Sequence, residues 1–310
     1  MVTITAVVPT IGRSRWLVPC LEALRRQQGP PLELLVVDQA LAPLDLPDGL
    51  ADRVVRPGCN RGFAGGTNFG LALAAGELVA TVNDDALVEP GWLAALAAAL
   101  AADPQAAAAQ GVNLALAAPA IADGCGLTWN RWWQAVQVGH GEAAPPAGGP
   151  VREVFGVSAT AALFRRAALD RVARDGAFFD PRLRTYYEDA ELAGRLRAAG
   201  FRALLVPGAR VRHAGSASVV TASASRGRWR LIYGNRYLAA ARLLGGRFWP
   251  RLPRMAARDL LDLAAAARRA DLPRLAGIAA GWGRALRHLP AFARRGAPAL
   301  PLEQIEGRRR

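Results

Sequence analysis

Two adjacent carboxylates, Asp84 and Asp85, follow an apolar run at residues 78–82 that has the length and composition of a buried strand. Adjacent buried acids repel one another, which is costly unless a cation lies between them or water screens them. Mg²⁺ or Mn²⁺ suits such hard oxygen ligands and usually takes phosphate oxygens as well. A solvated acidic turn is the simpler interpretation of this pair taken alone.

A second acid pair, Glu188 and Asp189, opens a predicted helix after two tyrosines. Acids in the first turn, with Arg195 and Arg197 in later turns, complement the helix dipole and need no functional explanation. Aromatic rings packed on the acids would, however, raise the pKa of one carboxyl and prepare it to act as a base. Both interpretations stay open.

A glycine-rich segment at residues 60–70 precedes another predicted helix. Glycines permit close approach of a ligand to the backbone, and a helix N-terminus offers free N–H groups to an anion such as a pyrophosphate. The segment matches neither the Walker nor the dinucleotide fingerprint, and a tight strand-to-helix turn explains it equally well.

Two weaker candidates have simple structural explanations. His213 follows an alternating β segment, and a lone histidine is more often structural than a ligand unless carboxylates lie nearby. Trp129, Trp132 and Trp133 lie close together and would either pack a hairpin or, with Tyr187, form an aromatic platform for an acceptor.

The first half of the chain alternates between predicted strands and helices. We expect strands at residues 4–8, 32–37, 54–55 and 78–82, and helices at residues 16–28, 62–75 and 92–101. This alternation implies an α/β fold with a mostly parallel sheet flanked by helices. Ligands bind beyond the carboxyl ends of such strands, where Pro9, Thr10, Asp38 and the first acid pair fall.

The alternation weakens after residue 110. We expect a strand over residues 154–165, another over residues 203–206, and helices over residues 258–270 and 274–289. The last two helices mix leucine and alanine with arginine, so they would lie on an anionic membrane surface or form a bundle against the rest of the protein or a second subunit. Residues 305–308 resemble a protease-cleavage linker.

Composition limits the class of protein. With 310 residues and 52% hydrophobic content, the chain can bury a sizeable core. All 39 basic residues are arginine, since lysine does not occur, and this bias weakens any inference from the net charge of +14 to nucleic acid. We therefore expect no nucleic-acid partner.

Cellular location is inferred from three features. Cys20, Cys59 and Cys125 form neither a disulfide framework nor a zinc motif, which favours a reducing cytoplasm. The N-terminus enters a strand without a secretory pattern, and the longest uncharged run, residues 104–122, contains two prolines and several amides. We expect a cytoplasmic protein, either free or peripheral on the cytoplasmic face of the inner membrane.

Six motifs in a fixed order strengthen these hypotheses: Val8-Pro9-Thr10, Val36-Val37-Asp38, Asn60-x-Gly-Phe-Ala-Gly-Gly-x-Asn68, Asn83-Asp84-Asp85, Tyr187-Glu188-Asp189 and His213-Ala-Gly-Ser216. Together they resemble the inverting family 2 glycosyltransferases with a GT-A fold, especially the bacterial rhamnosyltransferase-like members. The resemblance implies a GT-A catalytic domain over residues 1–224, with a Rossmann-like nucleotide-sugar-binding half (1–110) and an acceptor half (111–224). A basic helical region, residues 225–310, follows.

The resemblance also implies a role for each motif. Asp189 would be the catalytic base beside Glu188, while Asp85 and His213 would hold the divalent metal and Asp38 would contact the nucleotide base. The remaining implied contacts to the nucleotide sugar are Pro9, Thr10, Asn60, Gly62, Phe63, Gly66, Asn68, Asn83 and Asp84.

The implied reaction is metal-dependent transfer of a sugar from a dTDP-, UDP- or GDP-sugar to a glycan, lipid-linked or small-molecule acceptor, with inversion. Rhamnosyl transfer in cell-surface polysaccharide synthesis is the narrower expectation. The alternatives are a non-catalytic nucleotide-sugar-binding or membrane scaffold relative, and nucleotidyl transfer on a similar sheet. The segments at residues 10–13 and 38–41 depart from the family pattern, so the nucleotide base stays open, as does the oligomeric state.

Overall fold

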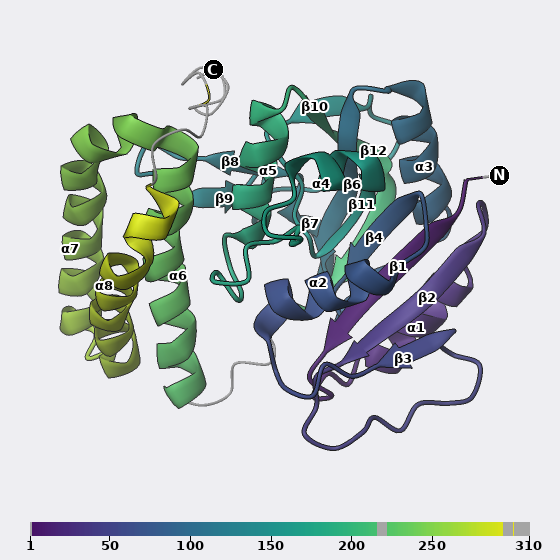
Figure 1. Cartoon of the computed structure of the whole chain (residues 1–310), viewed down its shortest axis with the longest axis horizontal. Coiled ribbons are helices and arrows are strands. Elements are labelled where there is room, and N and C mark those ends of the chain that lie inside the picture. The colour runs from purple at the N-terminus through teal and green to yellow at the C-terminus, as the bar shows by residue number, and fades with distance from the viewer. Residues whose placement is uncertain (1, 216–221, 294–299, 301–310) are drawn as a thin grey trace.

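The computed structural model describes residues 2–215, 222–293 and 300. Ser216, the end of the sixth motif, and residues 305–308 lie outside these ranges. A central twisted sheet carries helices on its faces, and a group of C-terminal helices packs beside it (Figure 1). This arrangement confirms the α/β fold with a C-terminal helical region.

Within the described residues the main sheet has ten strands in the order β10-β12-β6-β11-β4-β1-β2-β3, with β5 beside β12 and β7 beside β6. Their bounds are β1 (Ile4–Thr10), β2 (Leu32–Asp38), β3 (Arg53–Val55), β4 (Leu78–Val82), β5 (Ala86–Val88), β6 (Ala106–Ala115), β7 (Ala118–Gly124), β10 (Arg152–Val154), β11 (Ala161–Arg165) and β12 (Arg202–His213). A separate hairpin pairs β8 (Leu127–Trp129) with β9 (Ala135–Gln137).

The helices α1 to α5 belong to the first 200 residues and α6 to α8 to the C-terminal region. Their bounds are α1 (Leu17–Arg25), α2 (Gly62–Leu73), α3 (Trp92–Ala102), α4 (Arg166–Val172), α5 (Glu188–Ala198), α6 (Ala222–Leu244), the 3₁₀ helix η1 (Gly245–Arg251), α7 (Leu252–Arg268) and α8 (Leu272–Phe292). In the described ranges, no helix combines the length and apolarity that crossing a bilayer requires.

The strands at the centre of the sheet are parallel and buried. β1 pairs in parallel with β2 and β4, and its last residue, Thr10, is in register with Asp38 at the end of β2. Every residue of β4 is buried, because apolar clusters cover both faces of the sheet. The carboxyl ends of β1, β2 and β4 therefore meet at one edge, as the sequence predicts.

The structure corrects two predicted strands. The run at residues 154–165 is divided between β10 and β11, because the segment between them leaves the sheet: Gly156 lies so close to Ala193 of α5 that a Cβ would clash, and the Ser158 amide donates to the Gln110 side chain at 2.6 Å. The strand predicted at residues 203–206 is the longer β12, which continues past an irregularity between Leu205 and Arg210.

Candidate active site

A cavity of about 580 Å³ lies where β1, β4 and β12 end and α5 begins. Both acid pairs reach it, the first from the turn after β4 and the second from the first turn of α5. The predicted residues that line it are Pro9, Phe63, Asn83, Asp84, Asp85, Tyr187, Glu188, Asp189 and His213. Residues from five different motifs thus meet in one cavity.

Asp84 is held from the end of β1 and from the loop that follows it. The Thr10 hydroxyl donates to its carboxylate at 2.5 Å, and the Ser14 hydroxyl donates to its backbone carbonyl at 3.0 Å. Burial raises the pKa of Asp84 to about 6, and the negative charge of Asp85 adds to this effect. A carboxylate in this position is stabilised by any cation that enters the cavity.

His213 lies between two carboxylates. Its Nε2 lies 3.2 Å from Asp85 Oδ1, and its Nδ1 lies 2.8 Å from Asp123 Oδ2. Burial alone would lower the pKa of His213, but the hydrogen bonds with Asp123 and Asp85 outweigh burial and raise the pKa to about 9. Asp123, near the end of β7, is not predicted as a site residue from the sequence, because a single acid in a partly exposed strand forms no motif.

These residues fit a divalent metal of the kind that the motif resemblance implies. Asp85 offers an oxygen and His213 a nitrogen, and Asp123 on the far ring nitrogen fixes the histidine as second ligands commonly do. Among the described residues, no group of three or more His, Cys, Asp or Glu side chains is arranged to hold an ion alone. Two protein ligands are nevertheless sufficient for Mg²⁺ or Mn²⁺, whose remaining positions are usually filled by water and phosphate oxygens.

The second acid pair lies at the inner wall of the cavity, where Glu188 is buried and Asp189 is half-buried. Asp189 Oδ1 accepts the N–H of Ala190 at 2.7 Å, and burial raises the pKa of Asp189. Burial together with the charge of Asp189 raises the pKa of Glu188 well above its ordinary value, and Glu188 Oε2 has no hydrogen-bond partner in the described part of the chain. Carboxyls in such surroundings accept protons readily, which is the property of a general base.

The loop before α5 is strained and is held by the C-terminal helices. Arg184, Tyr186 and Tyr187 have φ angles of 62°, 71° and 71°, which are uncommon for residues with a Cβ. Asn235 of α6 places its amide nitrogen 2.8 Å from the Tyr186 carbonyl, within reach of the Leu183 and Thr185 carbonyls as well. Arg284 of α8 in turn donates to the Asn235 amide oxygen at 2.9 Å.

The glycine-rich segment serves the fold more than the cavity. The first N–H groups of α2 are already used within the protein, by the Asn60 side chain for Gly62 (2.8 Å), the Thr185 hydroxyl for Phe63 (3.2 Å) and the Arg184 carbonyl for Ala64 (2.8 Å). They are not free to bind a pyrophosphate as the sequence suggested. Phe63 is the one member of the segment that lines the cavity.

Three other predicted contact residues are also engaged elsewhere. Asn68 exchanges two hydrogen bonds with the backbone of Phe179, at 2.7 and 2.9 Å. Gly66 packs so tightly on Gln39 that a Cβ would clash. Asp38 is 1% exposed, accepts two backbone N–H groups and pairs with Arg56 at 2.9 Å. None of the three lines the cavity, and each instead fixes a loop around it.

The tryptophans take the simpler of their two interpretations. Trp129 and Trp133 are 4% and 2% exposed and belong to an apolar cluster with α6 and α8. Trp132 lies under the guanidinium of Arg254 at 5.3 Å. They pack the β8–β9 hairpin against the C-terminal helices and do not form the expected platform. Tyr187, whose ring centroid lies 5.9 Å from that of Trp129, does line the cavity.

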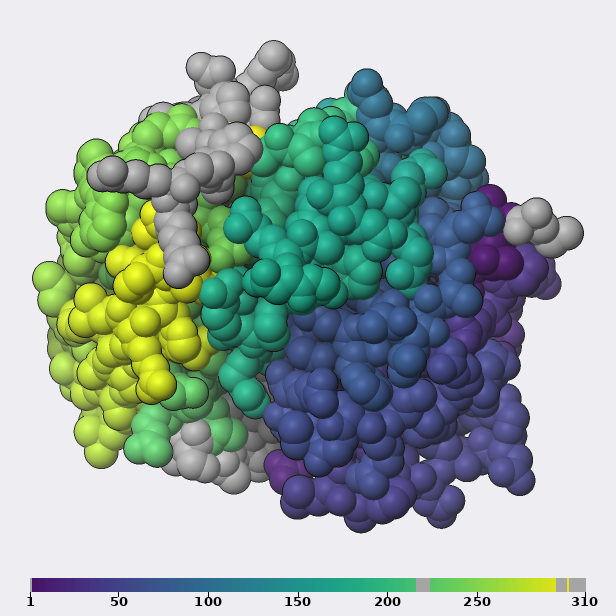
Figure 2. Space-filling view, in the orientation of Figure 1, coloured from purple at the N-terminus to yellow at the C-terminus, as the bar shows by residue number. Residues whose placement is uncertain are grey.

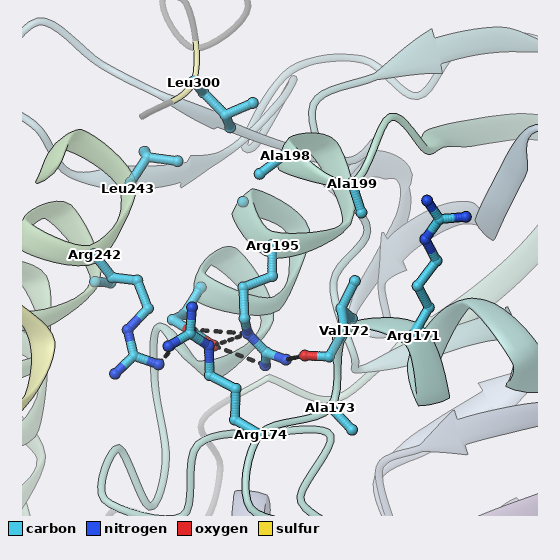
Figure 3. Close-up of a pocket in the computed structure, with 13 residues that line it drawn as sticks. Arg171, Val172, Ala173, Arg174, Arg195, Ala198, Ala199, Arg242, Leu243 and Leu300 are labelled. Atoms are coloured by element: carbon cyan, nitrogen blue, oxygen red, sulfur yellow. Dashed lines mark hydrogen bonds and ion pairs between the residues drawn. The ribbon is translucent and has the colours of Figure 1, made fainter. Parts of the chain in front are cut away.

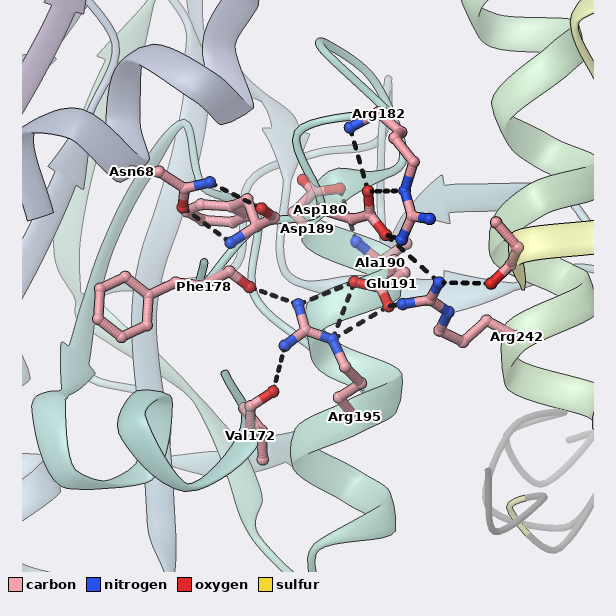
Figure 4. A network of polar contacts seen from close by, with 12 residues as sticks. Asn68, Val172, Phe178, Asp180, Arg182, Asp189, Ala190, Glu191, Arg195 and Arg242 are labelled. Atoms are coloured by element: carbon pink, nitrogen blue, oxygen red, sulfur yellow. Dashed lines mark hydrogen bonds and ion pairs between the residues drawn. The ribbon is translucent and has the colours of Figure 1, made fainter. Parts of the chain in front are cut away.

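A second cavity, of about 350 Å³, lies between α4, α5 and α6 (Figure 3). Its inner wall is a neutralised network in which Glu191 of α5 accepts hydrogen bonds from Arg195 (2.8 Å) and Arg242 (3.1 Å) (Figure 4). Arg242 also pairs with Asp180 at 3.3 Å. This network anchors α5, two residues beyond Asp189, to α6.

Comparisons with known proteins identify the family. The model described as glycosyl transferase family 2 matches residues 5–115, and the model described as glycosyl transferase family group 2 matches residues 78–279. A comparison with curated protein sequences gives no match.

Two solved structures share the fold. The mannosyltransferase PcManGT from Pyrobaculum calidifontis, in complex with GDP-Man and Mn²⁺, is 22% identical with a TM-score of 0.53, over 94% of this chain and 83% of that one. GalNAc-T7 with UDP, GalNAc and Mn²⁺ is 14% identical with a TM-score of 0.62, over 80% of this chain and 49% of that one, so this chain spans about half its length. Since the second family model covers well over half of the sequence, the chain belongs to the glycosyl transferase family group 2, and its residues 5–115 match the family 2 model as well.

Proposed function

We propose that the protein is an inverting glycosyltransferase that moves a sugar from a nucleoside-diphosphate sugar to an acceptor hydroxyl. The observation that carries this proposal is the single cavity lined by Asp84, Asp85 and His213 together with Glu188 and Asp189. The arrangement supplies a cation-binding group and a proton acceptor, which a displacement at an anomeric carbon requires.

Asp189 is the proposed base. It takes the proton of the acceptor hydroxyl while that oxygen attacks the anomeric carbon, and the bond from the anomeric carbon to the diphosphate oxygen breaks. The pKa of Asp189, raised by burial, makes it a stronger proton acceptor than an exposed carboxylate. Because one displacement occurs, the configuration at the anomeric carbon inverts and no covalent nucleophile is needed.

Asp85 and His213 are the proposed ligands of Mg²⁺ or Mn²⁺. When bound, the ion would neutralise the charge that develops on the departing nucleoside diphosphate. This end of the cavity is lined by Pro9 and Asn83, and the Thr10 hydroxyl holds the Asp84 carboxylate there. The proposed contacts to the nucleotide sugar are these three residues and Asp84.

The donor is a dTDP-, UDP- or GDP-sugar, and the presence of UDP and of GDP-Man in the two similar structures supports this class. Rhamnosyl transfer to a lipid-linked acceptor in cell-surface polysaccharide synthesis is the narrower proposal, resting on the motif resemblance. A lipid-linked acceptor would be met at the cytoplasmic face of the inner membrane, so we include peripheral membrane contact through the C-terminal helices.

A donor panel tests the proposal. Purified full-length protein is incubated with UDP-, dTDP- and GDP-sugars, with Mn²⁺ or with a chelator, and release of the nucleoside diphosphate is measured. We expect slow metal-dependent hydrolysis of one donor class and thermal protection by it. Protection without turnover, even with a panel of glycan and lipid-linked acceptors, would favour the non-catalytic binding relative. Pyrophosphate release from a nucleoside triphosphate would favour nucleotidyl transfer.

A further inference from the structure

The helix α7 carries its acidic residues on its inner face and exposes apolar residues on its outer face. Its two acidic residues, Asp259 and Asp262, are 0% and 5% exposed. Between Arg254 and Arg268, the exposed residues are all apolar: Ala257, Leu260, Leu261, Ala264 and Ala267. A helix on the surface of a soluble protein normally has the opposite polarity.

The inner contacts show why α7 takes this orientation. Asp259 accepts hydrogen bonds from the Tyr237 hydroxyl and the Trp282 indole, each at 2.7 Å, and pairs with Arg236 at 2.9 Å. Asp262 accepts from the Tyr233 hydroxyl at 3.0 Å and pairs with Arg258 and Arg274. Rotating α7 to hide its leucines would leave these buried partners without a carboxylate.

The neighbouring helix α8 also exposes mainly apolar residues. Its exposed positions from its first residue to the last turn are Leu272, Ala276, Ala279, Ala280, Gly283 and Leu286, followed by Arg287. The two helices pack against each other on the side of the molecule away from the strands (Figures 1 and 2). Leu260, Leu261, Leu272 and Leu286, which are 58%, 55%, 69% and 74% exposed, are the large apolar side chains of what we call the outer α7–α8 face.

The charges around this face have one sign. Arg254, Arg268 and Arg269 are exposed at the ends of α7, and Arg287 is exposed in the C-terminal part of α8. The acids of the described residues 222–293 are Asp259 and Asp262, which are buried, and Asp271, which is partly buried and caps α8 by accepting the Arg274 amide at 3.0 Å. A second copy of the chain on the same face would bring arginines together and gain no opposing acids. An anionic surface complements them.

We propose that the outer α7–α8 face docks on an anionic phospholipid surface. The leucines and alanines lie at the boundary of headgroups and acyl chains, and the arginines reach phosphate groups along their apolar stems. This inference deepens the proposed function by naming the surface on which a lipid-linked acceptor is met. Docking needs no catalysis, so it is tested independently of the reaction.

Vesicle flotation with the full-length protein tests the proposal. We expect binding to phosphatidylcholine vesicles that contain about 30% phosphatidylglycerol, and much weaker binding to phosphatidylcholine alone or at high salt. The double variant L260Q/L261Q should bind at least about tenfold more weakly. The triple variant R254Q/R268Q/R269Q should lose about fivefold for each arginine on anionic vesicles.

A matched control replaces exposed apolar side chains elsewhere. L73Q and V151Q alter residues that are 38% and 51% exposed and lie off the outer α7–α8 face, and they should bind vesicles like the unaltered protein. Thermal unfolding confirms that each variant is folded. Equal vesicle binding by L260Q/L261Q overturns the proposal, as does absence of binding by the unaltered protein. Self-association abolished by L260Q/L261Q would assign the face to a second copy instead. If binding behaves as expected while donor hydrolysis is absent, the docking stands and the proposed reaction fails.

Discussion

Nε2 of His213, the last residue of β12, lies 3.2 Å from Oδ1 of Asp85 in the turn after β4. Backbone pairing maintains this approach, because His213 is in antiparallel register with Ala86 of β5 and the Ala214 amide donates to the Asp85 carbonyl at 3.0 Å. The pair is therefore fixed by the sheet itself, and side-chain substitutions there should alter ion binding more than folding.

Affinity for Mn²⁺ should rise with pH. In the metal-free protein His213, with a pKa of about 9, holds a proton that blocks its nitrogen as a ligand. Between about pH 7 and 9, ion binding must release this proton, so the affinity should rise about tenfold per pH unit. Below about pH 6 Asp84 also becomes protonated, and the affinity should fall more steeply. Calorimetry at several pH values measures this slope, and in H213Q it should be flat from pH 7 to 9. A flat profile for the unaltered protein would exclude His213 as a ligand.

The substitution D123N should weaken Mn²⁺ binding. Asp123 holds Nδ1 of His213 at 2.8 Å and so orients the opposite nitrogen toward Asp85. Loss of such a supporting carboxylate typically costs about 10- to 100-fold in metal affinity. Calorimetric titration with Mn²⁺ measures this directly, and the exposed-carboxylate variant D48N provides the control. Unchanged affinity in D123N would mean that the contact serves folding alone.

The substitution D189N should strongly reduce transfer but not donor binding. The amide cannot accept the acceptor proton, so turnover should fall by about 10²-fold or more, while the cation end of the cavity is intact. Turnover and donor affinity are measured side by side, by product analysis and calorimetry. Full turnover in D189N would move the role of base to another residue.

The substitution N235A should lower turnover more than it raises the donor KM. Without the amide, the carbonyls of Leu183, Thr185 and Tyr186 lose a donor in a strained loop, and the unfolding free energy should fall by about 1–3 kcal/mol. Release of the loop should also displace the start of α5, which carries the acid pair. Steady-state kinetics and denaturant unfolding test both effects. The comparison variant N130A alters a side chain that holds a loop by Trp132 and Gln134, and should lower stability alone.

The substitution E191Q should destabilise the fold. Glu191 is wholly buried and neutralises Arg195 and Arg242, so the neutral amide leaves the buried guanidinium of Arg195 uncompensated and that of Arg242 paired with Asp180 alone, at a cost of about 3–5 kcal/mol. The matched variant E22Q breaks an exposed pair with Arg26, which is worth less than about 1 kcal/mol. Urea unfolding of both compares a buried pair with an exposed one. Similar values for the two would show that the Glu191 network contributes little.

Much of the fold could be predicted because the central strands carry a strong local pattern. The largely apolar runs of β1, β2 and β4 are typical of a buried parallel sheet, and each is followed or closed by polar residues at the same edge. The break between β10 and β11 was not predictable, since it depends on Gly156 meeting α5, a contact that only the folded chain makes.

The residues of the site likewise include some that the sequence predicts and some that it does not. Acid pairs and a histidine are recognisable by type, and their roles stay predictions until they are tested. Asp123 and Asn235 act through partners about 50 or more residues distant, so no local pattern marks them. Conversely, Asn68 and Gly66 belong to a motif but do not line the cavity. Asn68 is hydrogen-bonded to the backbone of Phe179, and Gly66 packs against the side chain of Gln39, so both residues hold loops.

The amide of Asn235 joins a C-terminal helix to the loop that leads into α5. Recombination between members of the family should respect this link. A hybrid that combines the sheet of one family member with the C-terminal helices of another would take the Asn235 position and the loop at residues 183–187 from different proteins, and these hydrogen bonds would be lost. A hybrid that takes residues 183–187 and α6 from the same protein would keep them.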